Sequence, residues 1–254
     1  DEAAHGSLVT VSPRETDAGI DVYAYPHNET STGVTSPVYR VAAPNALTLV
    51  DGTSIAGAAP VDLTQVDAYY FSLQKALGSD GGLWVAILSP AAIERARRVE
   101  ECADGRWVPQ FLSLSAAIDN SRKDQTLNTP ALATIIMAER QVRWLLQRGG
   151  MDAVSAHCAQ ASSLIYDWAQ ANLAARPFVD NPAWRSPVTA TIEIDEAVNA
   201  SELAAHLRAR GIIDIGAYRG VGANQLRIGT WPSVEVEDVE ALLACIDYCL
   251  ERVL

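Results

Sequence analysis

The chain has 254 residues, and at a usual domain size of about 150 residues this is enough for one large domain or two modest ones. Hydrophobic residues make up 49% and charged residues 20% of the chain, which is typical of a globular protein and excludes disordered or collagen-like classes. The net charge of -12 disfavours nucleic acid as a partner, and the apolar stretches are far shorter than the roughly 20 residues that a membrane span requires. We therefore expect a cytoplasmic protein that binds neither nucleic acid nor a membrane.

The four cysteines predict neither a disulfide framework nor a metal site. Cys245 and Cys249 are one helical turn apart, whereas Cys102 and Cys158 are isolated in the sequence. Such spacing favours reduced, mostly buried thiols, and we expect no bound metal.

Short apolar segments in the first third of the chain predict β-strands, and the period then changes to that of helices. Several of these segments are continuous apolar runs, which is typical of strands covered on both faces in parallel α/β sheets. Because a strand is expected so close to Asp1, which is not Met, we also expect that a preceding segment is missing. The expected strands are 7–12, 19–25, 46–50, 68–72 and 83–88, and the expected helices are 90–102, 130–147 and 151–173.

A linker rich in Pro and Asn at 177–182 precedes a compact βαββα pattern. Its expected elements are strand 188–194, helix 200–210, strands 212–215 and 225–229, and helix 235–253. The sequence therefore predicts an α/β protein with a large α/β domain at 1–150, a connecting helix and linker at 151–184, and a small α+β domain at 185–254.

Lys75 and Asp51 are the first candidates for chemistry. Lys75 is one of only two lysines among 19 Lys and Arg residues, and it follows segment 67–74, which predicts a largely buried strand. An ammonium there must be desolvated or paired, although a lysine that reaches the surface from a strand end is the ordinary alternative. Asp51 follows strand 46–50 at the carboxyl edge, where open α/β sheets bind ligands, although helix capping or turn formation is its ordinary role.

A lysine amine near a buried carboxylate is the arrangement that pyridoxal phosphate (PLP) enzymes require. The lysine forms a Schiff base with the cofactor aldehyde, and the carboxylate keeps the pyridine nitrogen protonated. The polar loop 27–33, HNETSTG, follows another strand and offers hydroxyl and amide groups, although by itself it predicts only a turn.

An ordered series of motifs extends the argument over essentially the whole chain. The motifs are HNETSTGV at 27–34, VDGTS at 50–54, YYFSLQK at 69–75, SDGGLW at 79–84, GRWVP at 105–109, TLNTP at 126–130, YR at 218–219 and NQLR at 224–227. This series resembles the phosphoserine aminotransferase family, particularly its actinobacterial branch, within the class V aminotransferases. The resemblance implies the fold-type I architecture of PLP enzymes, with a mostly parallel large domain whose N-terminal part is absent here and a small C-terminal α+β domain.

The resemblance also implies roles for individual residues. Lys75 would be the Schiff-base lysine and the base that moves the proton between the substrate α-carbon and the cofactor. Asp51 would pair with the pyridine nitrogen, and Thr30 would bond the cofactor near its ring hydroxyl. Gln74 would contact the cofactor phosphate.

Two further pairs complete the implied site. Asn128 and Thr129 would reach the cofactor phosphate from the neighbouring subunit, so the resemblance implies a homodimer with shared active sites. Arg227 would clamp the substrate α-carboxylate and Arg219 the substrate phosphate, although surface ion pairs are the ordinary alternative for both. Tyr218 stands where some relatives carry His, a departure that leaves phosphate selectivity open.

The implied reaction is the transfer of an amino group between glutamate and 3-phosphohydroxypyruvate, which gives 2-oxoglutarate and phosphoserine in serine biosynthesis. Ala76, where many family members carry Asn, is a second departure from the family pattern. The alternatives are another class V enzyme, such as an alanine:glyoxylate aminotransferase or a cysteine desulfurase, or an inactive fragment of such an enzyme. A desulfurase requires a reactive cysteine on a mobile loop, and none of the four cysteines has an evident setting of that kind.

Overall fold

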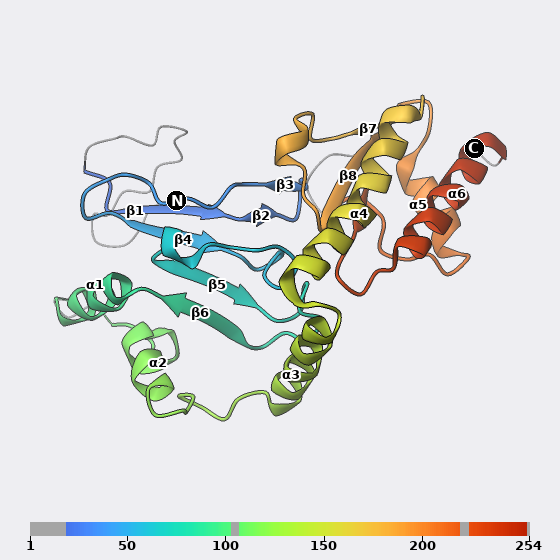
Figure 1. Ribbon diagram of the computed structural model, residues 1–254. Helices are drawn as coiled ribbons and strands as arrows, with labels where there is room; N and C mark the ends of the chain where they lie inside the picture. Colours follow the sequence, from blue (N-terminus) through green and yellow to red (C-terminus); the bar gives the residue numbers. More distant parts are fainter. Residues whose placement is uncertain (1–18, 103–106, 219–223, 253–254) are drawn as a thin grey trace.

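Two β-sheets, each with a hydrophobic cluster of its own, organise the computed structural model, which describes residues 19–102, 107–218 and 224–252 (Figure 1). The first sheet has the order β1-β4-β5-β6, in which β1, β4 and β5 are parallel and β6 is antiparallel to β5. Its strands are β1 (Val22–Pro26), β4 (Leu47–Asp51), β5 (Ala68–Ser72) and β6 (Trp84–Leu88). These match four of the expected strands, and the expected strand at 7–12 lies outside the described residues.

β5 has the bounds expected for the strand at 68–72, but the wider segment 67–74 is not strand to its end and is less uniformly buried than the sequence indicated. β5 ends at Ser72, the Tyr70 side chain is 39% exposed and Gln74 is exposed. Successive side chains of a strand point to opposite faces of the sheet, and here Tyr69 is buried whereas Tyr70 lies on the more exposed face. Lys75 lies in a turn after the strand and not at the strand end itself.

Besides the strands of the two sheets, the described elements up to residue 184 are a short hairpin and a series of helices, and the last of the long helices among them, α4, packs against the second sheet. Helix α1 begins where Ser89 Oγ accepts a hydrogen bond from the Ala92 amide at 3.1 Å, with Pro90 in the first turn. Gly149, with φ of 107°, ends α3 in a left-handed conformation and permits the reversal into α4. The elements are hairpin β2 (Asn28–Glu29) and β3 (Val34–Thr35), 3-10 helices η1 (Leu63–Gln65), η2 (Gln110–Leu112) and η3 (Pro182–Trp184), and helices α1 (Pro90–Glu101), α2 (Leu114–Ser121), α3 (Leu132–Gln147) and α4 (Gly150–Ala171).

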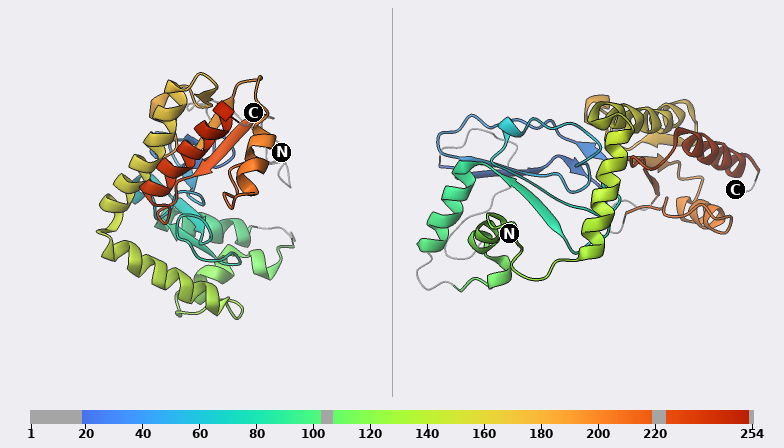
Figure 2. Two further views of the ribbon diagram at one scale, coloured as in Figure 1. Left: turned by 90° about the vertical axis from the view of Figure 1, so that its right-hand side faces the viewer. Right: turned by 60° about the horizontal axis from the view of Figure 1, so that its bottom comes forward.

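The second sheet is antiparallel, in the order β7-β8-β9, and lies beyond the carboxyl ends of β1, β4 and β5 (Figures 1 and 2). The alternating side chains of β8 that face its helices, such as Ile192, are fully buried in a cluster with Leu203 and Ile246. The elements are β7 (Ala175–Pro177), β8 (Thr189–Ile194), α5 (Ala200–Arg208), β9 (Gln225–Gly229) and α6 (Val236–Arg252).

The strand expected at 212–215 is wrong. Asp214 has φ of 61°, a left-handed conformation that interrupts an extended chain, and only an isolated bridge joins Gly216 to Leu226. The expected domain limits at 150 and 185 stay a prediction, because α4 contributes to both clusters and β7 joins the second sheet. No helix among the described residues is both long and apolar enough to span a membrane.

Candidate active site

The parallel strands β1, β4 and β5 end at one edge, which faces the second sheet (Figure 1). Asp51 is the last residue of β4, and in register it pairs with Pro26 on one side and Tyr70 on the other. Its Oδ1 accepts a hydrogen bond from the Thr53 amide at 2.8 Å, which leaves Oδ2 without a hydrogen-bond partner among the described residues. The carboxylate is thus fixed in orientation by its own turn and keeps one oxygen for a ligand.

The turn after Asp51 packs directly on a buried tyrosine. A Cβ at Gly52 would lie 2.2 Å from Cζ of Tyr69, so only glycine permits this approach. The Tyr69 hydroxyl lies 3.1 Å from Nδ1 of the buried His27, and burial lowers the pKa of His27 to about 4. Burial first, and the negative charge of Asp51 second, raise the pKa of Tyr69. His27 and Tyr69 are therefore neutral at pH 7, and this buried pair supports the turn that follows Asp51.

The β2-β3 hairpin is tied to the same turn. Asn28 Nδ2 donates to Ser54 Oγ at 2.9 Å, and Ser54 Oγ donates in turn to the main-chain oxygen of Asn28 at 2.9 Å. Asn28 Oδ1 is buried and has no partner among the described residues. These bonds place the segment that carries Thr30 next to the end of β4.

Lys75 lies half-buried in the turn after β5 and is followed in the chain by Ala76 and Leu77, which are buried in a hydrophobic cluster that also contains Leu73. Its Nζ is 5.9 Å from the centre of the Trp231 ring. Burial first, and the positive charge of Arg227 second, lower the pKa of Lys75. A cation that is partly desolvated and repelled by a second cation is poised to lose its proton or to bind an anion.

Arg227 projects from β9 on the face opposite the cluster that holds Leu226 and Ile228. Its Nη1 donates to the main-chain oxygen of Thr30 at 3.3 Å, and its guanidinium carbon lies 4.7 Å from the centre of the Tyr218 ring. Burial lowers the pKa of Arg227. The contacts bring Thr30, Lys75 and Arg227 to one junction between the two sheets.

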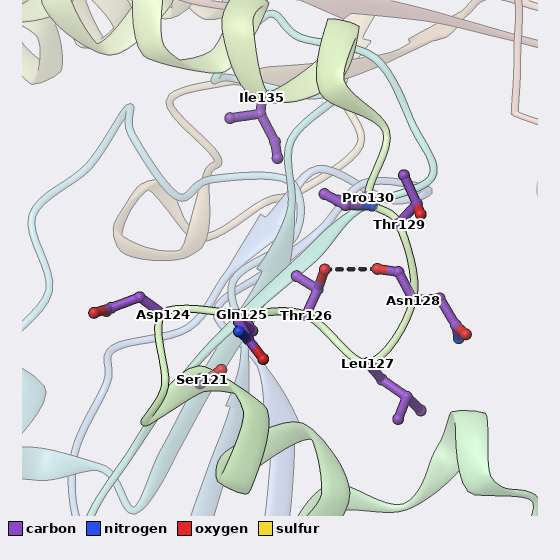
Figure 3. A pocket seen from close by; sticks show the side chains of 9 residues that line it. All are labelled: Ser121, Asp124, Gln125, Thr126, Leu127, Asn128, Thr129, Pro130 and Ile135. Atoms are coloured by element: carbon purple, nitrogen blue, oxygen red, sulfur yellow. Dashed lines mark hydrogen bonds between the residues drawn. The ribbon is translucent and has the colours of Figure 1, made fainter.

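The other candidate residues are not brought to this junction by any contact among the described residues. Gln74 is exposed, and Arg219 lies outside the part of the chain that the structure describes. Asn128 and Thr129 are exposed on the loop between α2 and α3 (Figure 3). That loop borders a shallow depression of about 890 Å³ lined by Ser121, Asp124, Gln125, Thr126, Leu127, Asn128, Thr129, Pro130 and Ile135.

Sequence reasoning missed His27, Tyr69 and Trp231 as parts of the site. His27 and Tyr69 stand inside the motifs at 27–34 and 69–75, so their position in those motifs was a usable signal. No comparable signal pointed to Trp231, because its contact with Lys75 joins the two sheets.

Comparisons with known proteins identify relatives of this chain. A family model described as Aminotransferase class-V matches residues 11–221. A putative phosphoserine aminotransferase of Mycolicibacterium vanbaalenii is 51% identical over 239 residues, which are 94% of this chain and 64% of that protein. The phosphoserine aminotransferase of Rhodococcus jostii is 47% identical over 237 residues, 93% of this chain and 63% of the relative. This chain thus spans somewhat less than two thirds of the length of either relative.

Two solved structures share the fold. A phosphoserine aminotransferase from Cytophaga hutchinsonii has a TM-score of 0.84 at 24% identity and covers 100% of this chain, which corresponds to 70% of that structure. An alanine–glyoxylate aminotransferase from Nostoc sp. has a TM-score of 0.77 at 20% identity, over 91% of this chain and 62% of that structure. The likeness confirms the fold class expected from the sequence.

Proposed function

Since the chain belongs to the class-V aminotransferase family, we propose that it transfers an amino group between glutamate and 3-phosphohydroxypyruvate, with PLP as its cofactor. The observation that carries the proposal is the junction of the two sheets, where Lys75 Nζ lies 5.9 Å from the ring of Trp231, just after β9, and Arg227 of β9 donates to the main-chain oxygen of Thr30 at 3.3 Å. This junction lies at the carboxyl edge of the parallel strands, where Asp51 ends β4.

The residues present fit PLP. Lys75 offers an amine whose pKa is lowered by burial, and Asp51 offers a carboxylate oxygen that no described residue occupies. When bound, PLP supplies an electron sink for the negative charge that develops at the substrate α-carbon. We assign Asp51 to the pyridine nitrogen and Thr30, half-buried on the hairpin beside it, to the neighbourhood of the ring hydroxyl.

Lys75 would be the group that moves the proton at the substrate α-carbon. Because burial and the charge of Arg227 lower its pKa, a larger fraction of the amine is neutral at a given pH than for an exposed lysine. In its neutral form the amine would accept the proton of the substrate α-carbon, and as an ammonium it would hold that proton for donation in the next step. The turn at 73–77 holds this side chain next to the edge where Asp51 lies.

Arg227 would bind the substrate α-carboxylate. Its stacking on Tyr218 and its bond to the Thr30 main-chain oxygen fix the plane of the guanidinium, which lets two N–H groups face a carboxylate together. Arg219 is assigned to the substrate phosphate on the sequence motif alone.

Gln74, Asn128 and Thr129 are assigned to the cofactor phosphate, the last two from a second copy of the chain. Two observations support a homodimer that completes the site. Asn128 and Thr129 are exposed and have no contact with Lys75 among the described residues, and the groove that they border, of about 410 Å³, has apolar side chains in its lining that include the exposed Trp84 and Phe111.

The test is amino transfer by the purified chain with PLP, with glutamate as donor and 3-phosphohydroxypyruvate, glyoxylate or pyruvate as acceptor. We expect the visible absorbance of bound cofactor and a preference for the phosphorylated acceptor, both lost in Lys75→Ala and both kept in Lys123→Ala. Preference for glyoxylate would favour the alanine:glyoxylate alternative instead. Cofactor absorbance without turnover of any acceptor would identify an inactive fragment.

A cysteine desulfurase is not supported by the setting of the four thiols. Cys158 and Cys249 are buried, and burial raises the pKa of Cys158 to about 11. Cys245 is exposed on α6, and Cys102 ends α1, so each of the four is part of a helix or its cap. The predicted cytoplasmic location is in keeping with a biosynthetic aminotransferase and remains part of this proposal.

A further inference from the structure

Trp231 connects the second sheet to the lysine. It follows the end of β9, and its half-buried indole packs against the hydrophobic cluster that contains Leu73, Ala76 and Leu77, the residues on either side of Lys75. The Lys75 ammonium lies 5.9 Å from the centre of the ring, within the distance at which an aromatic face attracts a cation. Among aromatic side chains, the indole gives the strongest attraction of this kind.

The position of the indole is fixed by its own segment. A Cβ at Gly229 would lie 2.5 Å from Nε1 of Trp231 and 3.1 Å from Cδ1, so the missing side chain at 229 provides the space for the ring. The turn is closed by a hydrogen bond from the Val234 amide to the Trp231 main-chain oxygen at 2.8 Å, and the following Pro232 is buried. The position of the ring is therefore fixed by its own segment and does not depend on the contact with Lys75.

We propose that Trp231 is a positioning residue for Lys75, whose free ammonium rests on the face of the indole at the junction of the two sheets. This inference deepens the proposed function, because it gives the proton-moving amine of that reaction a defined resting place. The ring favours the charged form of Lys75, and so it opposes burial and the charge of Arg227, which favour the neutral form. These opposing effects on the pKa of Lys75 partly cancel. The contact with the ring also holds the amine at the junction, near the sheet edge that carries Asp51.

The charges around Lys75 are few in the described part of the chain. Arg227 of β9 is the cation whose field lowers its pKa, and Asp51 lies at the end of the neighbouring strand β4. From α4, the cluster contains Cys158, whose pKa is raised to about 11 by burial, so this thiol is uncharged at neutral pH. With these groups unchanged, removal of the ring alters the pKa of Lys75 in two opposite ways: loss of the cation–π contact lowers it, and any gain in hydration raises it.

The small number of lysines allows a direct measurement. Lysine labelled with ¹³C at Cε gives signals from Lys75 and Lys123 alone, and their chemical shifts against pH yield both pKa values in the 254-residue chain. Loss of one signal in Lys75→Arg assigns it, and the exposed Lys123 is the internal control.

Three variants test the role of the ring. Trp231→Leu should lower the pKa of Lys75 by about 0.5, the value that follows from the usual strength of a cation–π contact, and Trp231→Phe should lower it by about half as much. Gly229→Ala should act in the same direction as Trp231→Leu, because the added Cβ displaces the indole without removing it. If Trp231→Leu does not fold, the other two variants carry the test.

The matched control is Trp144→Leu. Trp144 packs against the same cluster and lies under a different cation, Arg148, at 4.8 Å, so its loss should leave the pKa of Lys75 unchanged. An unchanged or raised pKa of Lys75 in the Trp231 and Gly229 variants would overturn the proposal, since a rise means that the indole only excludes water. The titration needs neither PLP nor substrate, so a chain that shows the shift but no amino transfer refutes the proposed function and leaves the contact standing.

Discussion

Gly52→Ala tests whether the carboxylate edge of the site depends on the contact between the Asp51 turn and Tyr69. The new Cβ would lie 2.2 Å from Cζ, 2.3 Å from the hydroxyl and 2.6 Å from Cε1 of Tyr69, whereas ordinary contact begins at 3.4 Å. The Tyr69 ring is 2% exposed and its hydroxyl bonds to His27, so it has no free space into which to move. Overpacking of this kind costs about 1 to 3 kcal/mol, and loss of the His27 bond adds about 1 kcal/mol.

We therefore expect Gly52→Ala to lower the free energy of unfolding by about 3 kcal/mol, which at this chain length lowers Tm by about 6 to 12 °C. Urea unfolding followed by circular dichroism, together with a thermal scan, measures both quantities. The matched control is Gly81→Ala, because a Cβ at Gly81 meets nothing within 4 Å and should change stability by less than about 0.5 kcal/mol. Equal midpoints for the two variants would show that the Asp51 turn does not rest on Tyr69 as described. Because Asp51 is attached to the displaced turn, we also expect weaker binding of PLP by Gly52→Ala than by the control.

Three further predictions concern the pH dependence, the buried charge and the assembly. Burial lowers the pKa of His27 to about 4 in the folded chain, against 6.5 for an exposed histidine, so the unfolded chain binds more protons between these two pH values. Stability should therefore fall as the pH drops from 6.5 to 4, by at most about 3 kcal/mol, and His27→Gln should flatten the dependence of the urea midpoint on pH over that window. Asp67→Ala should lower the free energy of unfolding in urea by about 3 kcal/mol. The reason is that the buried carboxylate accepts hydrogen bonds from the Arg40 side chain, the Thr48 amide and the Ser89 hydroxyl at 2.7, 2.9 and 2.8 Å. Asp62→Ala, at an exposed turn, should lower it far less, and equal losses of stability in the two variants would contradict this account. Under the proposed function, Lys75→Ala and Asn128→Ala should each lack amino transfer. Unfolding and refolding the two variants together should restore part of it, because a mixed dimer has one site with an intact Lys75 and an intact Asn128. A mixture as inactive as its components would argue against a shared site.

The assignment of strands and helices from the sequence succeeded where local pattern decides structure. Strands 68–72 and 225–229 have the expected bounds, and helix α1 begins at Pro90, as expected for the helix at 90–102. The exception is 212–215, whose apolar pattern favours a strand but whose Asp214 adopts a left-handed conformation. Pairing direction was not available from local pattern either, since β6 reads like its parallel neighbours but pairs antiparallel with β5.

The sequence by itself determined which functional groups are present. They are a scarce lysine, a carboxylate at a strand end and a series of motifs that together indicated a PLP-dependent aminotransferase. The tertiary structure decided which of these groups meet. Arg227 reaches the main-chain oxygen of Thr30 across 197 residues of chain, and Trp231 reaches Lys75 from the second sheet. Such contacts depend on how two separately packed units dock, and no local propensity encodes them, because the hydrophobic burial that drives docking is not directional. Asn128 and Thr129 are exposed in the single chain, and their role remains a prediction that a second copy of the chain would fulfil.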